Sequence, residues 1–89
     1  MNIEIELLEQ IEIVIKKLEN EYDKEINDGI MKLIYKRYTN ALNILKNNKD
    51  INEINIVGGV RAYMDSYNDY NNPLLGELYK AEKLYKQLV

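Results

Sequence analysis

Apolar residues recur at intervals of three and four along most of this chain, and this spacing restricts the fold more than any other feature. An α-helix has about 3.6 residues per turn, so such side chains share one face and form a stripe that favours burial. Between about residues 3 and 27 the stripe consists of Leu7, Leu8, Ile11, Val14, Ile15, Leu18, Tyr22 and Ile26. The alternation at Ile3–Leu7 is typical of a strand, but the later spacing and the length predict a helix.

Two further segments show the same spacing. Between residues 30 and 48 the stripe is Ile30, Ile34, Tyr38, Ala41, Leu42 and Leu45, and after residue 73 it is Leu74, Leu78, Ala81, Tyr85 and Leu88. Gly29 can adopt the left-handed conformation that ends a helix, so we expect a break at Asn27–Gly29, with one continuous kinked helix as the alternative. Asn72 is predicted as the N-cap of the last helix and Pro73 as its first residue.

The segment from 51 to 70 is predicted as one more helix, with Asp50 as an N-cap that accepts from the Glu53 amide. Its bulky side chains share one face of a helical wheel: Ile56, Val60, Tyr63, Met64, Tyr67 and Tyr70. Small residues lie nearly opposite: Gly58, Gly59, Ala62 and Ser66. Glycine costs about 1 kcal/mol inside a helix. Three explanations for the pair stay open: close packing of another helix, a break that leaves residues 51–57 as a short helix of their own, or backbone exposed for a partner.

Four helices with short connections are expected to pack as antiparallel neighbours. The predicted fold class is therefore all-α, a small up-down-up-down four-helix bundle whose third helix is continuous, kinked or broken. A chain of 89 residues has room for one core, so residues 1–89 are expected to form a single domain. Three long helices with an irregular third segment are the structural alternative.

The composition excludes several kinds of chemical site. The chain contains no His and no Cys, and only one Ser and one Thr. Nucleophilic triads, thiolate metal sites and the Glu-x-x-His sites of helical bundles therefore lack their residues. We expect no cofactor, no metal and no enzymatic activity, and a metal protein or enzyme based on carboxylates alone is the remaining alternative.

Charge and aromatic content point to a contact surface for a protein. The net charge is −3 and all eight aromatic residues are Tyr, whose hydroxyl groups favour half-buried rims. Negative charge disfavours nucleic acid as a partner, so the basic strip on the second helix is interpreted as solvated surface, as is the pair Glu82–Lys86. That strip consists of Lys32, Lys36, Arg37 and Lys46. No apolar run has the length of a membrane span, and we expect a cytoplasmic location.

The functional prediction is a protein-binding surface on the third segment. Its residues supply aromatic anchors and negative charge for a basic partner: Tyr63, Asp65, Tyr67, Asn68, Asp69 and Tyr70. The alternative is a homodimer in which the helices pack closely at Gly58, Ala62 and Ser66.

In size, in sign of charge and at Tyr67–Tyr70, the chain resembles the small acidic helical immunity proteins with which bacteria neutralise their own bacteriocins. Some of those proteins use a helix rich in Asp and Tyr against a basic toxin. The resemblance implies a bacterial immunity or regulatory protein that acts by binding a protein.

Overall fold

The computed structural model describes residues 2–67 and 72–89, and these residues form a small all-α bundle. Its helices are α1 (Ile3–Glu21), α2 (Gly29–Lys46), α3 (Gly59–Ser66) and α4 (Pro73–Leu88). Two short 3-10 turns, η1 (Glu25–Asn27) and η2 (Ile51–Glu53), lie in the connections. No strand occurs in the described ranges, and the predicted all-α four-helix bundle is confirmed.

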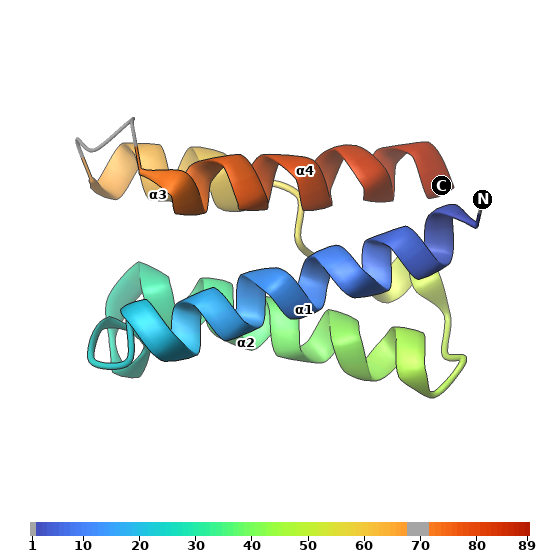
Figure 1. Ribbon diagram of the computed structural model, residues 1–89, viewed down its shortest axis with the longest axis horizontal. Coiled ribbons are helices and arrows are strands. Elements are labelled where there is room, and N and C mark those ends of the chain that lie inside the picture. The colour runs from blue at the N-terminus through green and yellow to red at the C-terminus, as the bar shows by residue number, and fades with distance from the viewer. Residues whose placement is uncertain (1, 68–71) are drawn as a thin grey trace.

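The helix α1 is the centre of the arrangement. It runs antiparallel to both α2 and α4, and it packs against both of them (Figure 1). The short α3 lies beside α4 and runs back toward the end of the bundle where α1 finishes (Figure 1). The chain therefore goes up, down, up and down, as predicted.

Most residues of the three predicted stripes lie in the core. The others are partly buried and pack against it: Leu8, Tyr22, Ile26, Ile30, Leu42 and Leu88. Met31 and Ile44, which the stripes did not include, are also buried. The core side chains of the long helices are almost completely buried: Leu7, Ile11, Val14, Ile15, Leu18, Met31, Ile34, Tyr38, Ala41, Ile44, Leu45, Leu74, Leu78, Ala81 and Tyr85. Polar contacts join the helices around this core. The Gln10 side-chain amide donates to the Glu77 carboxylate at 2.9 Å, linking α1 to α4. The Tyr35 hydroxyl donates to the Glu19 carboxylate at 2.6 Å, linking α2 to α1.

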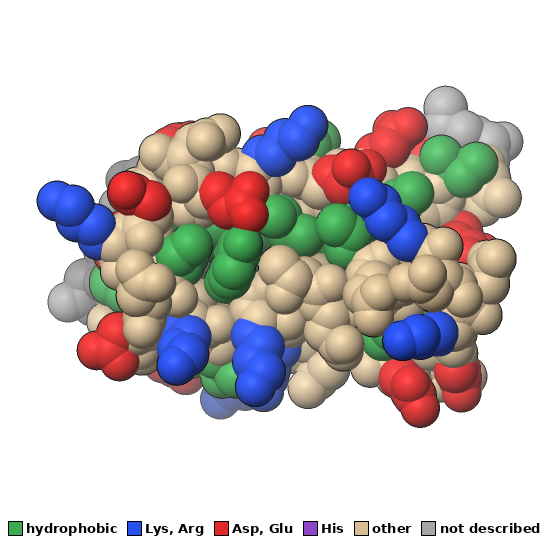
Figure 2. Space-filling view, turned by 90° about the horizontal axis from the view of Figure 1, so that it is seen from below, with side chains coloured by type: hydrophobic (Ala, Val, Ile, Leu, Met, Phe, Trp, Pro, Cys, Tyr) green, Lys and Arg blue, Asp and Glu red, His purple; other side chains and the backbone are tan. Residues whose placement is uncertain are grey.

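The face that α1 and α2 form together is partly apolar. Figure 2 shows this face from below, with hydrophobic side chains in a band along its middle and charged side chains of both signs around them. Leu8 of α1 and Leu42 of α2 are partly buried side chains that pack against the core.

The hydrogen bond with Glu19 raises the pKa of the Tyr35 hydroxyl above its ordinary value.

The helix ends follow the local signals in the sequence with two adjustments. Asn72 caps α4 as predicted, since its side-chain oxygen accepts from the Leu74 amide at 2.9 Å, and Pro73 is the first helical residue. The first helix ends at Glu21, several residues before the expected end near residue 27. Gly29 is left-handed, with φ +61°, but it begins α2 after the N-cap Asp28. The break between α1 and α2 is therefore real.

The prediction of one continuous helix over residues 51–70 is wrong. The segment begins with η2, continues as extended chain, and becomes helical only at Gly59. Gly58, just before the helix, has φ +100° and ψ −7°, a left-handed conformation that interrupts a right-handed helix. Of the three explanations for the glycine pair, the break itself is confirmed, but the short helix expected over residues 51–57 is wrong, since only Ile51–Glu53 form a 3-10 turn.

The extended chain before Gly58 alternates between the core and the solvent. Ile54 and Ile56 are buried, whereas Asn55 and Val57 are exposed, as expected where successive side chains point to opposite sides. This alternation buries two isoleucines within three residues. Asp50 also differs from expectation, because its side chain accepts from the Asn52 amide at 3.0 Å and caps the 3-10 turn.

Candidate interaction surface

A carboxylate from α4 holds the beginning of α3. The Glu82 carboxylate accepts from the Gly58 amide at 3.2 Å and from the Val60 amide at 2.8 Å, and Glu82 is only 8% exposed. The first amides of a helix lack partners within the helix, and the positive end of the helix dipole favours a negative charge. Glu82 therefore fixes where α3 begins and how it lies against α4.

The i,i+4 spacing of Glu82 and Lys86 predicted a solvated pair, and this contact of Glu82 with α3 was not predicted. Within the described residues no ion pair joins Glu82 to Lys86. In the sequence, the indication of a buried role is that Glu82 directly follows Ala81, a residue of the predicted apolar stripe; both are buried in α4.

At the other end of α3, one asparagine joins three helices. The Asn72 side-chain amide donates to the Tyr63 hydroxyl at 2.8 Å and also to the Tyr22 hydroxyl, the residue that follows α1. Since the oxygen of the same side chain caps α4, Asn72 links the ends of α1, α3 and α4. This network fixes the position of Tyr63, which is 3% exposed.

The ring of Tyr67 stacks on the ring of Tyr63. The ring centroids are 4.9 Å apart and the planes make an angle of 28°. Tyr67 is 38% exposed and Met64, three residues earlier, is 40% exposed. The structure thus presents an aromatic ring and a thioether to the solvent on a support that belongs to the core.

The predicted partner-binding residues are divided by the structure. Tyr63 lies in the core, so it supports the surface and does not itself reach a partner. Tyr67 and Asp65 are exposed at the end of α3. Asn68, Asp69 and Tyr70 lie outside the described residues, and their role stays a prediction.

The three small residues proposed for close packing do not form one helical stripe. Gly58 precedes α3 as its left-handed N-cap. Ala62 is half-buried within α3 and Ser66, the last residue of that helix, is exposed. Because Gly58 is not part of the helix, Gly58, Ala62 and Ser66 do not share one helical face, and they do not form a continuous groove along α3.

Exposed carboxylates gather at the end of the bundle where α1 and α3 finish. Glu21, Asp23 and Glu25 are exposed at and after the end of α1, and Asp65 is exposed near the end of α3. Figure 1 shows both helix ends and the α1–α2 connection at the same end of the bundle. We call this surface the acidic end; it comprises Glu21, Asp23, Glu25, Met64, Asp65 and Tyr67.

Two basic residues lie at the acidic end, Lys17 near the end of α1 and the exposed Lys24 between Asp23 and Glu25. The Lys17 ammonium group lies 2.8 Å from the Glu21 carboxylate, and this contact raises the pKa of Lys17. No ion pair involves Asp23, Glu25 or Asp65 within the part of the chain that the structure describes. The acidic end therefore carries unpaired carboxylates at Asp23, Glu25 and Asp65 beside the positive charge of Lys24.

The described residues hold no cluster of metal-ligating side chains and no membrane-spanning helix. Across residues 2–67 and 72–89, no three His, Cys, Asp or Glu side chains come together in a way that could hold a metal ion. None of the described helices is both long enough and apolar enough to cross a membrane.

The buried hydroxyl group of Tyr38 on α2 provides a test of the packing of the core. It is 1% exposed, and no described residue forms a hydrogen bond with its hydroxyl group. Replacing Tyr38 by Phe is expected to raise the free energy of unfolding by about 1 kcal/mol, because an unpaired buried hydroxyl group is costly. Urea unfolding at neutral pH measures the change, and Tyr79→Phe, at a residue that is 60% exposed, is the control with no expected effect. A less stable Tyr38→Phe protein would contradict the prediction.

In Tyr38→Phe, the free energy of unfolding should also depend less on pH in alkaline solution. Burial, together with the negative charge of Glu82, raises the pKa of Tyr38 above the ordinary value of 10.0. The folded chain therefore keeps this proton while the unfolded chain releases it, so stability is lost as the pH rises above about 10. Tyr38→Phe should lose less stability than the wild type over that range.

Comparisons with known proteins agree over the full length of the chain. All of residues 1–89 match the model of a family described as "YeeD uncharacterised protein". The chain is 33% identical over 95 residues to "Uncharacterized protein YeeD" of Bacillus subtilis (strain 168), a match that covers 98% of this chain and 93% of the relative. No solved structure matches the chain. This small helical protein thus belongs to the YeeD family.

Proposed function

We propose that this protein is a non-enzymatic domain that binds a basic protein partner at its acidic end. The observation that carries the proposal is the exposed Tyr67 ring stacked on the buried Tyr63 ring. An exposed ring that is already held in place loses little conformational freedom when a partner covers it. Large, well-positioned aromatic side chains are also the residues that dominate binding at protein interfaces.

The neighbouring side chains favour the same kind of partner. Met64 adds an adaptable apolar contact next to Tyr67, and both side chains are about two-fifths exposed. The carboxylates of Asp23, Glu25 and Asp65 would attract a basic surface and accelerate its association. An apolar centre with a charged rim is the usual anatomy of a protein interface.

This proposal narrows the surface predicted from sequence. The buried Tyr63 would hold the Tyr67 ring in place and would not contact the partner itself, and Tyr67 would be the central contact residue. A toxin or bacteriocin immunity protein is the biological role that we propose, supported by the small size, the negative charge and the aromatic acidic surface. A regulatory protein with a basic partner would use the same chemistry.

Capture experiments with matched variants test the proposal. The immobilised wild-type chain should retain a basic protein from a lysate of the source organism, and Tyr67→Ala should retain about tenfold less, as expected for a central aromatic contact. The control is Tyr79→Ala, since Tyr79 is exposed on α4 and lies outside the acidic end. It should retain as much as the wild type. Circular dichroism checks that all variants remain helical.

A second variant separates binding from the stacking of the two rings. Met64→Gln leaves Tyr63 and Tyr67 intact and should also weaken capture. Equal capture by the wild type and both acidic-end variants would refute the proposed surface. Retention of an acidic protein would refute the proposed partner chemistry.

A further inference from the structure

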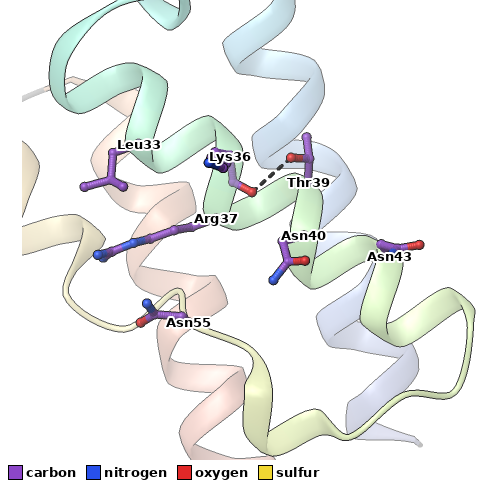
Figure 3. A pocket seen from close by; sticks show the side chains of 7 residues that line it. All are labelled: Leu33, Lys36, Arg37, Thr39, Asn40, Asn43 and Asn55. Atoms are coloured by element: carbon purple, nitrogen blue, oxygen red, sulfur yellow. Dashed lines mark hydrogen bonds between the residues drawn. The ribbon is translucent and has the colours of Figure 1, made fainter.

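A second surface on the molecule has the opposite charge. The outer side of α2 and the extended connection at Asn55 form an open hollow of about 560 Å³ (Figure 3). Lys36 and Arg37 are among its lining residues, and none of the lining residues is acidic. In a chain with 15 acidic and 12 basic residues, this hollow is a local region of positive charge. We call it the basic hollow.

The two cations of the basic hollow are available to a ligand. Neither Lys36 nor Arg37 forms an ion pair with another described residue. Arg37 is half-buried, and Figure 3 shows its side chain extending toward the connection that carries Asn55. The planar guanidinium group can donate two parallel hydrogen bonds to one oxyanion, a geometry that a lysine lacks.

Side-chain amides supply further donors around these cations. Asn40 and Asn43 lie on α2, and Asn55 lies on the opposite wall. The Asn43 oxygen accepts from the Asn47 amide at 2.5 Å, which leaves the Asn43 NH₂ group free to donate to a ligand. The Thr39 hydroxyl donates to the Lys36 carbonyl at 3.0 Å and adds no donor.

We propose that the basic hollow binds an oxyanion, a phosphate or carboxylate group carried by a small molecule. Arg37 would hold two of its oxygens, with Lys36 compensating charge and the Asn40 and Asn55 amides donating from either side. Leu33, which is 39% exposed, gives the same hollow an apolar wall for the rest of the ligand. The volume of about 560 Å³ lies within the range of small-molecule sites, about 300–1,000 Å³, and the lining is polar except for Leu33.

The tertiary structure is what separates this site from a solvated basic strip. Of the four basic residues predicted to form that strip, only Lys36 and Arg37 line the hollow, whereas Lys32 and Lys46 do not. The second wall exists because the segment before Gly58 is extended, which brings Asn55 opposite α2. The site lies apart from the acidic end and does not depend on its function.

Titrations followed by NMR test the site with two defined probes. Inorganic phosphate and citrate are added separately to the ¹⁵N-labelled chain at constant ionic strength. We expect saturable shifts confined to the α2 residues around Arg37 and to Asn55. Shifts with phosphate alone would identify a phosphoryl site, shifts with citrate alone would identify a carboxylate site, and either result supports an oxyanion ligand.

Two arginine variants provide the matched comparison. Arg37→Gln keeps a side chain of similar shape without the charge, and it should weaken binding by about tenfold or more, as expected for the loss of a bidentate charged contact. Arg61→Gln removes the other arginine of the chain, which is exposed on α3, and should leave the affinity unchanged. The proposal is overturned if neither anion gives saturable shifts, or if both variants weaken binding equally.

Discussion

Replacing Glu82 by Ala is expected to lower the free energy of unfolding by about 2–4 kcal/mol, since hydrogen bonds to charged groups contribute about 1.5–3 kcal/mol each. The substitution removes the acceptor of two amides, at Gly58 and Val60. No other described residue accepts a hydrogen bond from these two amides, and the cavity left on α4 removes packing as well. Urea unfolding followed by circular dichroism measures the loss.

Two further variants test whether the loss of stability in Glu82→Ala comes from the missing carboxylate. Glu82→Gln keeps one neutral oxygen as an acceptor and should lose roughly half as much stability, because bonds to neutral acceptors are about half as strong. Lys83→Ala, at the exposed next residue, should change little. Hydrogen exchange should show that the amides of α3 lose protection first in Glu82→Ala. If Glu82→Ala unfolds like Lys83→Ala, the carboxylate does not hold α3.

Substituting Ala for Gly58 is expected to lower the free energy of unfolding by about 1–3 kcal/mol, the cost of a left-handed conformation for a residue with a Cβ atom. Gly58 has φ +100°, and a Cβ atom built there meets nothing within 4 Å. The cost therefore comes from the backbone alone. Thermal or urea unfolding measures it.

Other glycines of the same chain supply the control. Gly76 is exposed inside α4, and a Cβ atom there also meets nothing within 4 Å. Gly76→Ala should raise the free energy of unfolding by about 0.5–1 kcal/mol, because Ala is the better helix former. Opposite signs for the two substitutions are expected, and a stabilised Gly58→Ala protein would contradict the break before α3.

Local signals predicted much of the fold. Most of the three long stripes became the core, because a stripe of Ile and Leu at helical spacing can be buried only when the segment is helical. Asn72 and Pro73 began α4 as expected, since capping depends on a few neighbouring groups. These features need no knowledge of what packs against them.

The segment from 51 to 58 was mispredicted for a physical reason. Ile56 and Val60, four residues apart, fit one face of a helix, whereas Ile54 and Ile56, two residues apart, fit the alternation of an extended chain. The choice between the two depends on the surface available to the isoleucines and on the bonds that Glu82 offers to the Gly58 and Val60 amides. Both belong to parts of the chain distant in sequence.

The candidate surfaces were also predictable only in part. The sequence predicted Tyr67 and Asp65 as contact residues, which stays a prediction. It placed Lys36 and Arg37 in a basic strip of four residues that was interpreted as solvated surface. It could not assign Tyr63 to the core or place Asn55 opposite Arg37, because both depend on how distant segments meet.

The amino-acid sequence by itself determined that this chain forms long amphipathic helices around one core, because helical periodicity and capping are properties of neighbouring residues. Only the tertiary structure decided where the third helix begins, which of Tyr63 and Tyr67 is exposed, and which cations line the basic hollow. Those outcomes depend on contacts between segments far apart in the chain, and a single carboxylate from α4 contributes to the first of them.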